Sequence, residues 1–162
     1  MRLECADGAL LELPLSFAAK SKLIAGMLED GFGLDEVIPI SQVSKPTMEK
    51  ICVFCEHLQA TGCDDLEIEH PLPSNDLSRH VDEWYVSFIS DGVDQATLFD
   101  LALAANYLDI KPLLKLASAR IATQIRSKPI EEIRRFFKMT NDFTPEEEAQ
   151  VREENTFAAQ YF

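Results

Sequence analysis

Basic residues are scarce in this sequence. Its 162 residues contain 15 Lys and Arg against 28 Asp and Glu, which gives a formal net charge of −13. Nucleic acids and anionic membrane surfaces are bound by clustered lysines and arginines, so this charge argues against both as partners. Apolar runs are also short, since none approaches the roughly 18 residues that a membrane span needs. The charged first residues leave no apolar core for a signal peptide.

Cysteines are few and scattered. Four of them cannot build a disulfide framework, and we expect free thiols and a location in the reducing cytoplasm and nucleus. Cys52 and Cys55 have the spacing of half a zinc site or of a redox pair. They also share the apolar face of a predicted helix with Leu58, which favours core packing. We expect no metal and no cofactor, with a metal or redox protein as the alternative. The four cysteines are Cys5, Cys52, Cys55 and Cys63.

Glycine and histidine are too rare and too dispersed for the common catalytic motifs. The six glycines form neither a Walker A nor a G-x-G-x-x-G pattern. With three histidines and no Gly-x-Ser-x-Gly elbow, a hydrolytic triad is not supported. Pairs of carboxylates carry no information among 28 acids. The sequence therefore predicts a protein that is not an enzyme.

What the chain does contain is enough apolar sequence, 46%, to close one core. Residues 2–5 and 10–13 predict a β-hairpin around the turn Ala6-Asp7-Gly8. Residues 16–30 have helical apolar spacing, which Ser21-Lys22 divides into two. Residues 37–40 predict a third strand, at an edge because Pro39 cannot donate to a central ladder.

Residues 61–83 are unlike their surroundings. They hold seven acids and one basic residue, Arg79, with Pro71 and Pro73 as breakers. This composition predicts a mobile acidic loop over residues 61–80.

Helices account for most of the remaining chain. Ser44 and Asp94 are predicted N-caps, and a further helix follows Lys111. Near the end, Thr144, Pro145 and Glu147 predict a capping box. A small sheet followed by many helices predicts an α+β fold with a helical extension.

The last 27 residues carry more large apolar side chains than short helices need to bury. They could pack on the main core, or they could form a groove for the helices of another protein. The pattern leaves both interpretations open. These side chains are Phe136, Phe137, Phe143, Phe157, Tyr161 and Phe162.

Three segments of the sequence carry a resemblance to a known family: residues 94–111, 129–134 and 141–155. Together they closely resemble the S-phase kinase-associated protein 1 family, the adaptor subunits of SCF (cullin, F-box) ubiquitin ligases. The resemblance covers nearly the whole chain. It implies a BTB/POZ-like domain over residues 1–126 that docks on a cullin. It also implies a two-helix extension over residues 127–162 that completes an F-box-binding surface.

The resemblance thus implies a non-catalytic adaptor that bridges a cullin to F-box substrate receptors for ubiquitin-dependent degradation. The alternative is an F-box-binding scaffold that acts outside ubiquitin transfer. Exposed apolar surface suggests that the free chain forms a weak homodimer. The positions that match or adjoin cullin-facing ones are Asn106, Tyr107, Ile51 and Cys55. Those that match or adjoin the F-box groove are Phe99, Leu114, Leu116, Ile121, Ile125 and Phe157.

Two positions have further implications. Phe157 stands where many relatives have tryptophan, so the area and the indole donor lost there favour a different receptor preference. Pro145 suits the first turn of a helix by itself. In some unicellular relatives the matching proline resembles a site of hydroxylation and glycosylation, so modification of Pro145 is a second interpretation.

Overall fold

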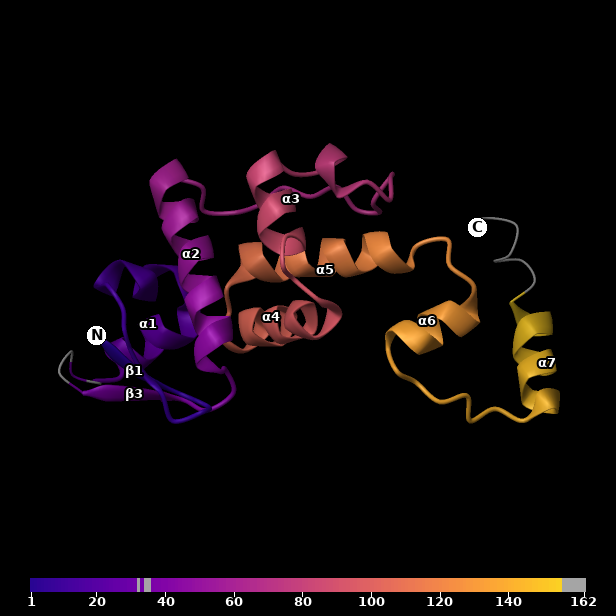
Figure 1. Ribbon diagram of the computed structural model, residues 1–162, viewed down its shortest axis with the longest axis horizontal. Coiled ribbons are helices and arrows are strands. Elements are labelled where there is room, and N and C mark those ends of the chain that lie inside the picture. The colour runs from indigo at the N-terminus through magenta and orange to yellow at the C-terminus, as the bar shows by residue number, and fades with distance from the viewer. Residues whose placement is uncertain (32, 34–35, 156–162) are drawn as a thin grey trace. The chain divides into compact units, whose positions relative to one another are not determined.

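The computed structural model describes residues 1–31, 33 and 36–155 and divides the chain into two compact units (Figure 1). The N-terminal unit is Met1–Thr123, and the C-terminal unit is Gln124–Phe162. This boundary lies three residues before the one expected from the sequence. The predicted α+β class with a small sheet is confirmed, and no helix in the described ranges has both the length and the apolarity to cross a membrane.

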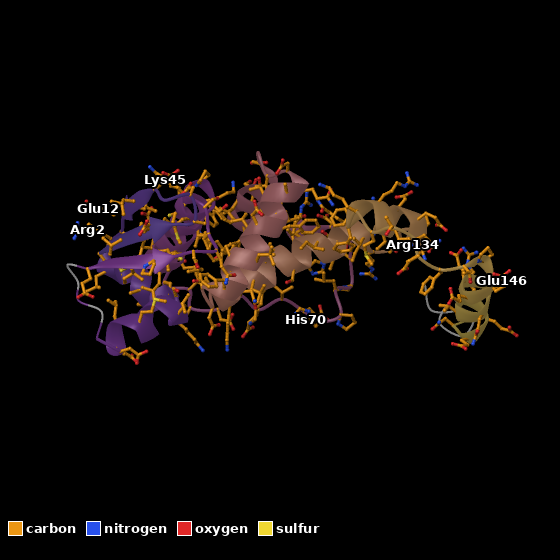
Figure 2. All side chains as sticks on the ribbon, turned by 90° about the horizontal axis from the view of Figure 1, so that it is seen from below. Arg2, Glu12, Lys45, His70, Arg134 and Glu146 are labelled. Carbon is orange, nitrogen blue, oxygen red and sulfur yellow. The ribbon has the colours of Figure 1, made fainter. Side chains whose placement is uncertain are left out.

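The sheet has three strands in the order β2-β1-β3. β1 (Arg2–Cys5) pairs antiparallel with β2 (Leu10–Glu12), which places Arg2 opposite Glu12 (Figure 2). β1 also pairs in parallel with β3 (Val37–Ile40), whose Pro39 is exposed at the edge. The hairpin and the edge strand are therefore confirmed. The buried face of the sheet consists of Leu3, Cys5, Ile38 and Ile40.

Ser21 divides the first helical segment, as the sequence predicts. A 3-10 helix, η1 (Leu15–Lys20), ends there and α1 (Lys22–Glu29) begins. The buried Ser21 hydroxyl accepts a hydrogen bond from the Ile24 amide (3.3 Å) and donates one to the Leu108 carbonyl (2.7 Å). One serine side chain thus caps α1 and ties it to a segment 87 residues away.

An aromatic cluster joins α2 (Lys45–Thr61) to α3 (Glu83–Ser90). Phe54 is fully buried, and its ring centroid lies 6.0 Å from that of Tyr85 and 5.3 Å from that of Phe88. His57 stacks on Trp84 with the ring centroids 3.5 Å apart. Aromatic rings therefore lie against one another where the two helices meet.

α4 (Gln95–Tyr107) and α5 (Lys111–Ile125) complete the core of the N-terminal unit. The predicted cap of α4 is confirmed, because the Asp94 carboxylate accepts a hydrogen bond from the Thr97 amide at 2.8 Å. Two residues after the end of α4 stands a left-handed residue, Asp109, with φ of 50°. The Ile110 amide then donates to the Ala105 carbonyl at 2.9 Å, which closes the last turn.

The acidic segment needs a correction. No α-helix or strand forms between Cys63 and Asp82, as expected for a loop, but the segment is not simply a mobile one. Leu66, Ile68 and Leu77 are buried in the core. The acidic residues between them face solvent. Because these acids dominate the composition, composition alone did not reveal that the apolar side chains anchor the segment.

Lys115 on α5 fastens this segment. Its ammonium group donates to the Asp65 carboxylate (2.6 Å) and to the Leu66 carbonyl (3.2 Å). The hydrogen bond from Lys115 lowers the pKa of Asp65. The stabilisation is therefore present above the ordinary aspartate pKa and is lost as the pH falls through the lower, folded-state value.

We predict that Lys115→Met speeds hydrogen exchange of the amides of residues 64–68 at neutral pH, because the loop loses both bonds from the ammonium group. Hydrogen-exchange mass spectrometry measures this directly. Lys50→Met, which changes a lysine on another helix, should leave these amides unchanged. Equal exchange in both variants would contradict the anchoring role of Lys115.

The C-terminal unit contains α6 (Ile130–Phe136) and α7 (Pro145–Glu154). Both helices begin where the sequence predicts, at Pro129 and at the Thr144 capping box. Neither helix has a buried residue. Short helices of this kind are only marginally stable alone. Their apolar side chains are therefore available to pack against a partner.

Candidate partner-binding surfaces

One exposed face of α4 brings together an amide, an aromatic ring and an aliphatic side chain. Phe99, Leu103 and Asn106 lie at spacings of four and three residues, which places them on the same side of the helix. Asn106 is exposed, Phe99 and Tyr107 are half-buried, and Leu103 is 69% exposed. An exposed leucine between aromatic residues suits a partner that covers apolar area. We call Phe99, Leu103, Asn106 and Tyr107 the α4 face.

Two positions predicted to face a partner on α2 are instead in the core. Ile51 and Cys55 are both buried. Their side chains pack in the core and are not accessible to a partner. This corrects the prediction of direct contact. The apolar side chain that α2 does expose is Val53, two residues away on the opposite side. Family position alone located the helix and missed the direction of its side chains.

Burial suppresses the reactivity of the two thiols of α2 at neutral pH. Burial raises the pKa of Cys52 and that of Cys55 to about 12. Both thiols therefore remain protonated at neutral pH. The protonated form is a poor nucleophile, because the thiolate is the reactive species. In the described part of the chain, no three His, Cys, Asp or Glu side chains gather in a way that could hold a metal ion.

We predict slow alkylation of Cys52 and Cys55 by iodoacetamide at pH 8, where a pKa of about 12 leaves roughly one thiolate in ten thousand. Peptide mapping after a timed reaction measures each cysteine separately. Unfolding in guanidinium should make both react at the rate of a free thiol. Fast reaction in the native state would show that the two thiols are accessible and acidic.

α5 carries four of the predicted F-box residues, and burial separates them. Leu114, Ile121 and Ile125 are half-buried. Leu116 is fully buried in the core, so its expected place in a groove is corrected. Phe157 lies outside the described residues. The predictions for Phe99, Leu114, Ile121, Ile125 and Phe157 stay predictions.

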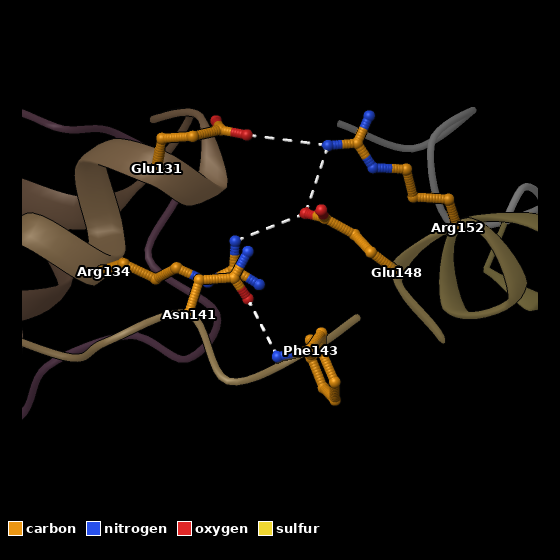
Figure 3. A network of polar contacts seen from close by, with 6 residues as sticks. All are labelled: Glu131, Arg134, Asn141, Phe143, Glu148 and Arg152. Atoms are coloured by element: carbon orange, nitrogen blue, oxygen red, sulfur yellow. Dashed lines mark hydrogen bonds and ion pairs between the residues drawn. The ribbon is translucent and has the colours of Figure 1, made fainter. Parts of the chain in front are cut away.

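Charged side chains join α6 to α7 inside the C-terminal unit (Figure 3). Arg134 Nη1 lies 3.3 Å from Glu148 Oε1, and Arg152 Nη2 lies 3.4 Å from the same oxygen. Arg152 also reaches Glu131 Oε1 at 3.6 Å. The hydrogen bond from Arg134 is the largest cause that lowers the pKa of Glu148. This network orients two helices that share no buried core.

Large apolar side chains remain exposed on the same unit. The Arg134 guanidinium carbon lies 6.0 Å from the centroid of the Phe143 ring, and Asn141 Oδ1 accepts a hydrogen bond from the Phe143 amide (3.3 Å) (Figure 3). Phe143 is thus held in place while its ring stays exposed. We call the exposed set the C-terminal apolar surface: Ile130, Phe137, Met139, Phe143 and Val151.

Pro145 is exposed at the first position of α7. The Glu147 carboxylate accepts a hydrogen bond from the Thr144 amide (2.8 Å), and the Thr144 hydroxyl accepts one from the Glu147 amide (3.3 Å). The bond from the Thr144 amide, and a second that the Thr144 hydroxyl donates to the same carboxylate (3.0 Å), lower the pKa of Glu147. The structural role of Pro145 at a helix start is confirmed, and its hydroxylation or glycosylation stays a prediction.

Reasoning from sequence missed Leu103, Val53 and Met139. For Leu103 a signal existed, because it falls four residues after Phe99 and outside the buried stripe of α4. Val53 likewise lies out of phase with the buried residues Ile51, Phe54 and Leu58. Helical phase would have found both.

Comparison with known proteins identifies the family of the chain. Residues 1–60 match the tetramerisation domain of the Skp1 family, and residues 111–158 match its dimerisation domain. An S-phase kinase-associated protein 1 homolog from Tetrahymena thermophila is 46% identical over 153 residues, which are 94% of this chain and 89% of that protein. The E3 ubiquitin ligase complex SCF subunit sconC from Arthroderma benhamiae is 41% identical over 160 residues, or 96% and 93%. An SCF ubiquitin ligase complex protein from Dictyostelium discoideum is 40% identical over 161 residues, or 96% and 93%. The chain belongs to the Skp1 family.

Proposed function

We propose that this chain is the non-catalytic adaptor of an SCF-type ubiquitin ligase, which joins an F-box substrate receptor to a cullin. The C-terminal apolar surface carries the proposal. Its five exposed side chains lie on and beside two helices without a buried residue, and the ion pairs of Arg134, Glu148 and Arg152 hold the two helices together. Such a surface is suited to the apolar faces of partner helices.

The proposed mechanism is positional. An adaptor that holds a receptor and a cullin at once raises the effective concentration of substrate lysines near the ubiquitin carrier. Such a role needs no catalytic side chain, and the protonated thiols of the half-buried Cys52 and the buried Cys55 are consistent with it. The relatives named as subunits of SCF ubiquitin ligase complexes support this assignment.

We predict that Phe143→Ala weakens binding of the full chain to an isolated F-box domain by about 2 kcal/mol, or roughly thirtyfold. Truncating an aromatic side chain that a partner covers typically costs this much binding free energy. The fold should be unaffected, because Phe143 is exposed and does not pack in the core. Isothermal titration calorimetry of the wild-type chain should also show the negative heat-capacity change of apolar burial.

Leu10→Ala is the matched control, because this exposed apolar side chain lies on β2 in the other unit. It should bind F-box domains as the wild type does. Failure of the wild-type chain to bind several different F-box domains would overturn the proposal. Equal weakening by both substitutions would show that the C-terminal apolar surface is not the contact.

A further inference from the structure

A pocket of about 270 Å³ lies in the N-terminal unit. It is formed by the end of η1, the start of α1, the loop at Asp64 and the start of α5. The buried side chains of Leu58 and Pro112 give it an apolar wall. Its volume is close to the ~300 Å³ at the lower end of small-molecule sites. The pocket therefore suits a compact ligand and not a helix or a strand.

Three lysines line this pocket: Lys20, Lys22 and Lys111. Asp64 and Asp109 also line it, so the formal charge of the lining is 3 − 2 = +1. This is unusual for a chain whose formal net charge is −13. We call this site the lysine pocket.

Two of these lysines, both exposed, lie near carboxylates without pairing directly with one, and Lys111 acts on Asp65 only through its charge. Within residues 1–31, 33 and 36–155, neither Lys22 nor Lys111 forms an ion pair. Lys20 does form one, with its ammonium nitrogen 2.7 Å from Asp64 Oδ1. The Lys20 side chain is only 18% exposed, whereas that of Asp64 is 90% exposed. A largely buried lysine side chain is thus paired with a carboxylate that sits in solvent.

We propose that the lysine pocket binds a compact phosphate dianion, that is, a phosphomonoester group. Lysine binds phosphate as a point charge, and a dianion can neutralise Lys22 and Lys111 together. The partly enclosed site strengthens such attraction relative to bulk water. A cation or a neutral apolar molecule would leave the two ammonium groups unpaired. This binding goes beyond the adaptor role and does not depend on it.

The ligand competes with Asp64. The Lys20 ammonium group already donates to the Asp64 carboxylate. A dianion in the pocket would compete with Asp64 for this ammonium group, and the two negative charges would repel each other. Removing the charge of Asp64 should therefore tighten binding, whereas removing the charge of Lys22 or Lys111 should weaken it. Opposite signs from neighbouring residues distinguish a defined pocket from general electrostatic attraction.

The test is a titration of the isotope-labelled full chain with inorganic phosphate, O-phosphoserine and a phosphoserine peptide, followed by amide chemical shifts at constant ionic strength. We expect saturable shifts at residues 20–24 and 109–114. Lys22→Gln and Lys111→Gln should each weaken binding about fivefold, and Asp64→Asn should tighten it about threefold. Lys45→Gln removes the same charge outside the pocket and serves as the control.

The outcomes separate cleanly. Saturation by O-phosphoserine alone would identify a small phosphomonoester as the ligand, and tighter saturation by the peptide would identify a phosphorylated protein segment. Shifts that chloride reproduces, or equal weakening by Lys45→Gln, would reduce the effect to charge screening and overturn the proposal. Absence of saturation with all three probes would do the same. F-box binding should be unchanged in every variant, so failure of this proposal leaves the adaptor role intact.

Discussion

Replacing Leu103 by lysine is expected to weaken the complex with a cullin at least a hundredfold while leaving the fold intact. Leu103 is 69% exposed at the middle of the α4 face, so the free chain loses little when its side chain becomes charged. In a complex the same position would be covered. A lysine there would carry an unpaired charge into the interface, and such a desolvation penalty amounts to several kcal/mol.

Leu10→Lys is the control for this effect, because Leu10 is 57% exposed on β2, outside the α4 face. Co-purification and calorimetry with the amino-terminal region of a cullin compare the two variants, and thermal unfolding checks that both are folded. Loss of cullin binding with unchanged F-box binding is the expected result. Cullin binding by Leu103→Lys at wild-type strength would exclude the α4 face as the contact.

The adjoining pair Asn106 and Tyr107 separates the adaptor from a scaffold that acts outside ubiquitin transfer. Their substitution by lysine should abolish assembly with the cullin and leave complexes with F-box proteins unchanged. A cellular role that survives this double substitution would favour the scaffold. Since Asn106 is exposed and Tyr107 is half-buried, the single Asn106→Lys variant is the cleaner test of contact.

Local signals in the sequence located helix ends well because each depends on a few neighbouring residues. The capping box of Thr144 and Glu147 formed as expected, and Ser21 ended one helix and began the next. The Pro39 strand took the edge position for an equally local reason, the missing amide donor.

Long-range contacts defeated the same approach. Lys115, about fifty residues later, fixes Asp65 and Leu66 to α5. The sequence around Asp65 and Leu66 contains no signal that predicts this contact. Leu66 and Ile68 are separated by an acid, so the segment looked polar although alternate residues are buried. For Ile51, Cys55 and Leu116, resemblance supplied the helix but not its phase, and the apolar face already placed the cysteine in the core.

The largest loss of stability is expected from Phe54→Ala. Phe54 is fully buried between α2 and α3, in ring contact with Trp84, Tyr85 and Phe88. Truncation removes the transfer free energy of the ring and leaves a cavity, which together lower the free energy of unfolding by about 3–5 kcal/mol. The edge contacts among the rings add to this loss.

Val53→Ala, at the adjacent but 51% exposed position, should change the free energy of unfolding by less than about 0.5 kcal/mol. Urea denaturation followed by Trp84 fluorescence measures both variants, since Trp84 is the one tryptophan of the sequence and lies in the affected cluster. Because α2 and α4 pack together, loosening α2 should also disturb the α4 face. Phe54→Ala should therefore weaken cullin binding through the fold, whereas Leu103→Lys weakens it with no change in stability. A Phe54→Ala chain as stable as the Val53→Ala chain would mean that the aromatic cluster does not support the core.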